Sequence, residues 1–176
     1  MDGKKMVAAE EKHLIPLDKV NGYEVRPGFY GINGATALRE GVNFTVSSLE
    51  AAGVELLLYH RGAKEPYAVL PFPKHYRIGS VYSMIVFGLD ICDFEYAYRV
   101  DGPYAPENGL IFDKTKPLLD PYARAVTGQS VWGERPNQDY EYRARVVVND
   151  FDWGDHVDPV RPIQDLIIYE LHVRGF

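Results

Sequence analysis

Short segments with alternating apolar and polar residues occupy the first hundred residues of the chain. In GVNFTVSS, residues 41–48, the valines and the phenylalanine fall on one face, and asparagine, threonine and serine fall on the other. In FEYAYRVDG, residues 94–102, Tyr96 and Tyr98 share a face with a phenylalanine and a valine. Such alternation is typical of strands in a half-buried antiparallel sheet. It predicts that Tyr96 and Tyr98 are buried in a core.

Two further segments, residues 54–60 and 80–89, are also rich in apolar and aromatic residues, and turn residues separate the segments. Residues 142–150 predict one more strand, after a proline-containing stretch with little periodicity. No window before residue 114 has a convincing helical repeat. Short strands at this spacing predict an all-β fold, an antiparallel β-sandwich of the immunoglobulin type.

The last segment, LIIYELHVRGF, differs from the earlier strands because its apolar residues are nearly continuous. Continuous apolar runs are typical of central strands in parallel sheets, which need a crossover of a dozen or more residues to reach a partner. The sequence offers no such partner, so we expect this strand to begin a second domain. The predicted organisation is a polar lead-in (1–22), a sandwich (23–150), a linker (151–165) and the truncated first strand of the second domain (166–176).

Composition and charge argue against several classes of protein. The net charge is −6 with both signs mixed along the chain, whereas nucleic-acid binding needs a clustered basic face. The single cysteine, Cys92, allows no internal disulfide, and we expect it to be buried as a small apolar group. The charged N-terminus lacks the apolar core of a signal peptide, and no run reaches the ~18 apolar residues of a membrane span. We therefore expect a cytoplasmic protein without a membrane partner.

Three stretches of the sequence resemble a known family. GINGATALREGVNFTVSS, YAYRVDGPYAPENGLIFDKTKPLLDPYARAV and IIYELHVRGF occur in the order found in the N-terminal region of glycogen-debranching and isoamylase-type enzymes. These enzymes belong to the α-amylase superfamily of glycoside hydrolases. The resemblance implies a β-sandwich related to glycogen-binding modules, followed by the first strand of a catalytic (β/α)8 barrel.

The resemblance also implies what the chain lacks. Retaining glycosidases need two carboxyl groups ~5–5.5 Å apart, and in this family those groups lie on later barrel strands. No catalytic residue is therefore carried over, no cofactor is implied, and we expect the chain to be inactive alone. The implied role is a non-catalytic module of an enzyme that hydrolyses α-1,6 bonds of glycogen or limit dextrin. The alternative is a stand-alone α-glucan-binding or regulatory module.

Candidate carbohydrate contacts are few. Related modules carry a lysine and a tryptophan where this sequence has Ala97 and Tyr104, so an aromatic ring is kept and the polar group is lost. Tyr104 is a candidate for stacking on sugar or for packing against the barrel. Trp132 is a second candidate sugar contact, and an anchor between sandwich and barrel is the alternative for it.

Candidates near the C-terminus concern the barrel. Glu170 and His172 lie two residues apart on one face of the predicted strand, where they would line the active-site floor or satisfy each other. Trp153 is a candidate anchor at the interface with the barrel. The acidic residues 150–158 do not match a calcium loop, so we expect a solvated connector and no metal.

Overall fold

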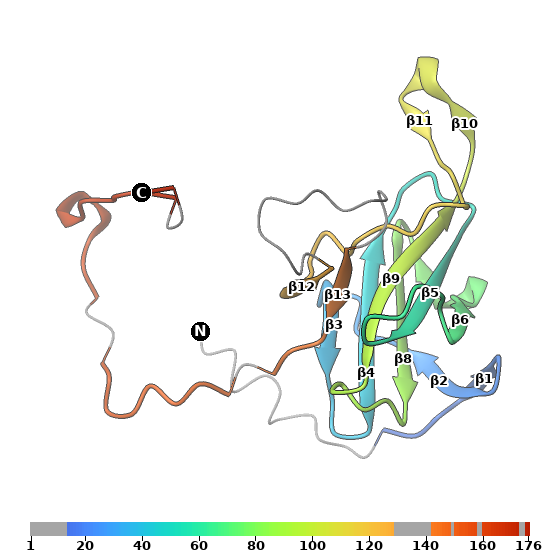
Figure 1. Cartoon of the computed structure of the whole chain (residues 1–176), viewed down its shortest axis with the longest axis horizontal. Coiled ribbons are helices and arrows are strands. Elements are labelled where there is room, and N and C mark those ends of the chain that lie inside the picture. Colours follow the sequence, from blue (N-terminus) through green and yellow to red (C-terminus); the bar gives the residue numbers. More distant parts are fainter. Residues whose placement is uncertain (1–13, 129–141, 149, 158–159, 173–174) are drawn as a thin grey trace.

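The computed structural model describes residues 14–128, 142–148, 150–157, 160–172 and 175–176. Two antiparallel sheets face each other and form a β-sandwich, which confirms the predicted fold class. Beyond residue 148 the described chain runs away from the sandwich as a tail (Figure 1). Helical structure in the described residues consists of three single-turn 3-10 helices: η1 (Lys74–Tyr76), η2 (Pro106–Asn108) and η3 (Ile163–Asp165).

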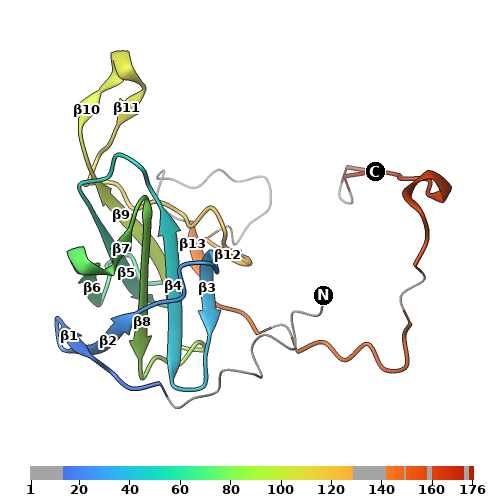
Figure 2. The same cartoon turned by 180° about the vertical axis from the view of Figure 1, so that it is seen from behind.

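The first sheet has the strand order β1-β2-β8-β4-β3, with β7 paired to β8 beside this path. Figure 2 shows it from behind, with β8, β4 and β3 in front. Its longest ladder joins β4 to β8 over seven residue pairs, from Gly41 opposite Phe87 to Ser47 opposite Val81. The strands are β1 (Asp18–Val20), β2 (Tyr23–Pro27), β3 (Gly34–Ala37), β4 (Gly41–Ser47), β7 (Arg77–Ile78) and β8 (Val81–Phe87).

The second sheet has the order β12-β13-β9-β5-β6, and β5 and β9 are its long central pair. Its strands are β5 (Gly53–His60), β6 (Ala68–Pro71), β9 (Phe94–Asp101), β12 (Ala125–Thr127) and β13 (Arg143–Arg145). A separate hairpin of β10 (Tyr104–Ala105) and β11 (Leu110–Ile111) projects from the end of β9 (Figure 1).

The core lies between the sheets and consists of the faces that the alternation predicted. Phe44 of β4 meets the edge of the Tyr96 ring of β9, with ring centroids 5.2 Å apart and planes at 72°. Tyr96 and Tyr98 are both buried, as expected. Edge-to-face aromatic pairs contribute about 0.5–1.5 kcal/mol beyond the burial of their area. Packing between the aromatic side chains of β4 and β9 therefore holds the two sheets together.

The outer face of β4 differs from the prediction because Asn43 and Thr45 are buried, although they lie on the polar side. The segment after β2 crosses this face, and the amide of Phe29 donates to Asn43 Oδ1 at 2.8 Å. Thr45 Oγ1 and Ser83 Oγ are 2.6 Å apart in the same buried network. A Cβ on Gly28 would collide with the Ser83 and Asn43 side chains, so only glycine fits at this crossing.

Three predictions about the termini and turns need correction. Strand β1 forms within the region predicted as a polar lead-in, because Asp18–Val20 pairs with β2. The strand predicted at residues 142–150 is short, since only Arg143–Arg145 pair with neighbours. Cys92 is exposed rather than buried, because it lies in the turn before β9 where its amide donates to Asp90 Oδ1 at 2.8 Å.

The last run, predicted as a strand whose partners this chain lacks, pairs with no other strand among the described residues. Residues 166–172 form no strand and are exposed, although Leu166 has extended backbone angles of φ −98° and ψ 141°. A strand needs a neighbour with which to exchange hydrogen bonds. No described residue supplies that neighbour, so this segment is extended without a ladder. Its assignment to the first strand of a barrel stays a prediction.

Candidate functional site

An apolar groove lies between the projecting hairpin and the turn from β4 to β5. Its volume is about 750 Å³. Side chains from the turn, from the end of β9, from the hairpin and from the segment that follows the hairpin line it, among them Leu49, Val100, Tyr104, Ile111, Phe112 and Leu118. The segment after the hairpin is fixed to β9, because Tyr98 and Leu118 exchange two backbone hydrogen bonds of 2.9 and 2.7 Å.

Tyr104, a sugar contact predicted from the sequence, lies at the rim of this groove. Its side chain is 73% exposed, and its backbone pairs with Ile111 across the hairpin. The hairpin can fold back because Gly102 leaves room for the Phe112 ring, whose Cγ would be 2.6 Å from a Cβ at that position. The Tyr104 ring is therefore available to a ligand or to a protein surface.

Two of the polar residues that line the groove, Asp113 and Lys116, are engaged in local interactions. Asp113 Oδ1 accepts from the Thr115 amide at 2.9 Å and from its hydroxyl at 2.5 Å. The Lys116 ammonium is 3.8 Å from Asp113 Oδ2. The hydrogen bonds from Thr115 hold the pKa of Asp113 below its ordinary value. The turn from β4 to β5 adds the polar side chains of Ser48 and Glu50 to the lining.

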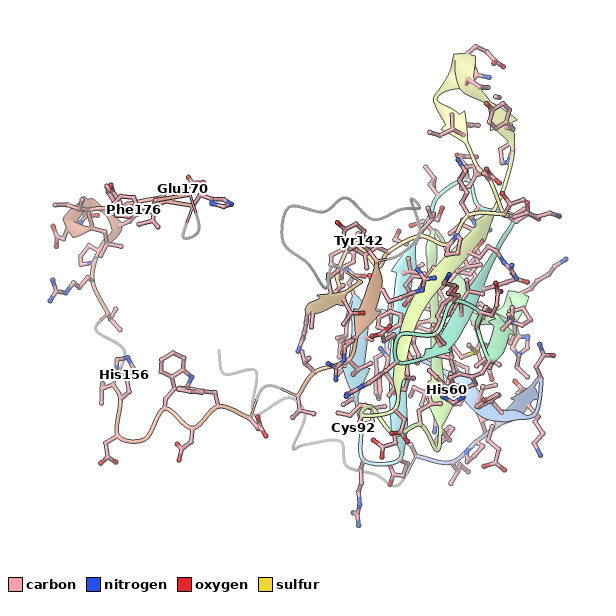
Figure 3. All side chains as sticks on the ribbon, in the orientation of Figure 1. His60, Cys92, Tyr142, His156, Glu170 and Phe176 are labelled. Atoms are coloured by element: carbon pink, nitrogen blue, oxygen red, sulfur yellow. The ribbon has the colours of Figure 1, made fainter. Side chains whose placement is uncertain are left out.

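A second exposed aromatic surface, which the sequence reasoning missed, lies where β5 ends and β6 begins. The rings of His60 and Tyr67 stack with centroids 4.3 Å apart and planes at 22°. His60 is labelled in Figure 3 at the end of the sandwich opposite the hairpin. Tyr67 is 39% exposed, and burial of its hydroxyl, followed by Tyr23 and Asp93, raises its pKa to about 12. The phenol therefore stays neutral at physiological pH.

A separate group of charged side chains lies on the outer face of the second sheet. Arg99 Nε donates to Glu55 Oε2 at 2.7 Å, and the Arg143 guanidinium lies 4.1 Å from the centre of the Tyr59 ring. Ala97, where related modules carry a lysine, is fully buried between them. The outer face therefore carries guanidinium and carboxylate groups, but none of them comes from position 97, where the resemblance places a lysine. The only sequence signal for Tyr67 was one tyrosine in a turn-rich segment.

The remaining candidates do not meet in a site. Glu170 lies on the tail, away from the sandwich (Figure 3). Glu170 and His172 are both exposed, and no hydrogen bond or ion pair joins the two. Trp153 is 69% exposed and contacts Phe151 edge to face at 4.8 Å. Trp132 lies outside the described residues. Among the residues that the structure covers, no three His, Cys, Asp or Glu side chains are placed to hold a metal ion.

Comparison with known proteins shows to which family the sandwich belongs. Residues 32–123 match the family described as carbohydrate-binding module 48, the isoamylase N-terminal domain. The chain belongs to this family. Isoamylase SU1 of Zea mays is 36% identical over 152 residues, which are 81% of this chain and 19% of that protein. The glycogen debranching enzyme of Serratia proteamaculans (strain 568) is 36% identical over 163 residues, 86% of this chain and 24% of that protein.

The carbohydrate-binding module 48 chain thus spans about a fifth to a quarter of the length of these relatives. Among solved structures, the apo pullulanase of Paenibacillus barengoltzii superposes with a TM-score of 0.55 over 81% of this chain and 19% of that one, at 22% identity. This likeness confirms the sandwich fold. In the described part of the chain, no helix combines the length and apolar character needed to cross a bilayer.

Proposed function

We propose that the chain is the N-terminal, non-catalytic module of a debranching glycoside hydrolase that cleaves α-1,6 bonds in glycogen or starch by a retaining mechanism. The observation that carries the proposal is the match of residues 32–123 to the carbohydrate-binding module 48 family. The similar glycogen debranching enzyme and isoamylase are four to five times longer than the matched part, which leaves room for a catalytic domain. In this proposal the module orients that domain and contacts α-glucan.

The contact with glucan is assigned first to the stacked pair of Tyr67 and His60. An aromatic ring can cover the C–H face of a sugar ring, and the exposed Asp93 carboxylate, whose charge acts on the Tyr67 phenol, can accept hydrogen bonds from its hydroxyls. Stacking on His60 restricts the orientation of the Tyr67 ring, which lowers the entropy lost on binding. Tyr104 and Trp132 remain further candidates from the sequence. Tyr104 has an exposed ring at a groove whose lining is mainly apolar.

Calorimetric titration of the chain with a linear maltooligosaccharide tests this assignment. We expect measurable binding at millimolar ligand and a roughly tenfold weaker Kd for Tyr67→Ala, which corresponds to about 1.4 kcal/mol. Tyr104→Ala measures the second candidate. Tyr169→Ala removes a tyrosine of the tail that is 72% exposed, against 39% for Tyr67, and serves as the control. Equal affinity of the Tyr67 and Tyr169 variants would refute the assignment to Tyr67.

The C-terminal candidates belong to the same proposal. Residues 166–172 would become the first strand of the catalytic barrel once neighbouring strands are present, with Glu170 and His172 at the active-site floor and Trp153 at the domain interface. The exposed apolar side chains of this run, among them Ile167 and Ile168, support a buried position in a larger fold. The alternative, a stand-alone glucan-binding module, predicts that the native protein binds glucan but releases no linear chains from it.

The compartment is also part of the proposal. We place the protein in the cytoplasm, where the sequence led us to expect it. The similar isoamylases of Zea mays and Arabidopsis thaliana are chloroplastic, so the family occurs in more than one compartment. Cell fractionation followed by immunoblotting would decide between them.

A further inference from the structure

The projecting hairpin is too small to hold its conformation alone. Its two strands have two residues each, and Tyr104 and Ile111, which pair across it, are both largely exposed. An isolated two-stranded hairpin is at best marginally stable in water. Leu49 on the opposite wall of the groove is also exposed, and so in part is Leu118. Apolar side chains from three segments thus gather around one open groove.

The chemistry of the groove favours a protein occupant over a glucan. Most of its lining side chains are apolar, among them Leu49, Val100, Ile111 and Phe112, and such side chains offer no hydrogen bonds to sugar hydroxyls. Of the three charged residues in the lining, Glu50, Asp113 and Lys116, the last two are paired with each other. Contiguous exposed apolar surface rimmed by polar residues marks an interaction site in soluble proteins.

We propose that this groove is the docking surface for the domain that follows the module in the same polypeptide, with Leu49, Ile111 and Leu118 as its apolar anchors. The inference rests on the proposed function, because that function supplies the second domain. The matched family is an N-terminal domain, and the relatives extend over more than three quarters of their length beyond the matched part. A covalently linked domain has a high effective concentration, so a small surface is sufficient for docking.

The docked domain would also stabilise the hairpin. Its backbone hydrogen bonds lie at an exposed end of the sandwich, and such bonds exchange their protons quickly unless they are covered. Docking covers them. The state of the hairpin therefore reports on docking without any measurement of catalysis.

The test compares two exposed isoleucines in two-residue strands. Ile111→Ser changes the groove, and Ile78→Ser in β7 is the matched control, with exposed fractions of 69% and 62%. In the full-length protein we expect the hairpin amides of the wild type and of Ile78→Ser to exchange hydrogen roughly tenfold more slowly than in the 176-residue chain. We expect Ile111→Ser to abolish this protection. In the 176-residue chain both variants should unfold at the wild-type temperature.

Three outcomes would overturn the inference. Hairpin exchange could be equally fast in the full-length protein and in the chain, or insensitive to Ile111→Ser. Ile111→Ser could weaken maltooligosaccharide binding by the chain, which would assign the groove to glucan. Hairpin protection in the chain could rise with concentration, which would assign the groove to a second copy. Failure of the proposed function is a separate result, because it appears as a full-length protein that does not hydrolyse α-1,6 bonds.

Discussion

Replacing Gly41 by alanine is expected to destabilise the sandwich by about 3 kcal/mol, because overpacked sites that cannot relax cost this much. Gly41 begins β4 opposite Phe87, where the two strands are in close contact. A Cβ at this position would lie against the Val86 carbonyl oxygen and within 2.8 Å of Phe87 Cα. Both are backbone atoms of the central strand β8, so relief requires a shift of the ladder. Urea denaturation followed by far-ultraviolet circular dichroism measures the change in the free energy of unfolding.

Gly53→Ala is the matched control for this substitution. Gly53 begins β5 as Gly41 begins β4, but a Cβ there would meet nothing within 4 Å. Its φ does not lie in the left-handed region, so alanine adopts the same backbone without strain. Alanine also restricts the unfolded chain, and we expect Gly53→Ala to be neutral or to stabilise by up to about 1 kcal/mol. Similar losses in the two variants would show that close strand packing at Gly41 is not the cause.

Tyr96→Phe is expected to destabilise the fold by about 2 kcal/mol at neutral pH, since the hydrogen bonds of buried charged groups contribute about 1.5–3 kcal/mol. The Tyr96 hydroxyl donates to Asp120 Oδ2 at 2.7 Å, and the Tyr122 amide donates to Oδ1 at 2.8 Å. Asp120 is 2% exposed. Removal of the Tyr96 hydroxyl leaves the buried Asp120 carboxylate with one hydrogen-bond donor fewer.

The adjacent core tyrosine is the control. Tyr98 points from the same face of β9 and is equally buried, but its hydroxyl has no hydrogen-bond partner in the structure. Removing an unsatisfied buried hydroxyl is neutral or stabilising, so Tyr98→Phe should leave the free energy of unfolding unchanged or raise it. Equal destabilisation by the two substitutions would contradict the role given to the Tyr96–Asp120 bond.

The destabilisation by Tyr96→Phe is expected to depend on pH. Burial raises the pKa of Asp120 above its ordinary value, and the hydrogen bond from Tyr96 lowers it again. Without the Tyr96 hydroxyl, the pKa of Asp120 in the folded state rises further. The folded variant therefore keeps the Asp120 proton to a higher pH than the unfolded chain does. Stability then falls more steeply with rising pH in the variant. We expect a smaller difference from wild type below about pH 3, where the carboxyl is mostly protonated in the folded and the unfolded state, than at pH 7.

The sandwich could be predicted from the sequence because its signal is local. Alternation in residues 41–48 and 94–102 placed Phe44, Tyr96 and Tyr98 in the core, where the structure has them. The candidate site could be predicted only in part. Tyr104, a candidate because of the family resemblance, has an exposed ring, whereas the stack of Tyr67 on His60 joins two residues on either side of a turn. Local patterns do not reveal such a contact.

The sequence by itself determined the class of fold, the family and the difference between the alternating strands and the last apolar run, because each depends on residue type and spacing along the chain. The tertiary structure decided which polar residues are buried. Asn43 and Thr45 lie on a polar face, yet the segment at Phe29 crosses over them and supplies their hydrogen bonds. It also decided that residues 166–172 remain without a ladder, because a strand forms only when a second strand lies beside it to exchange hydrogen bonds.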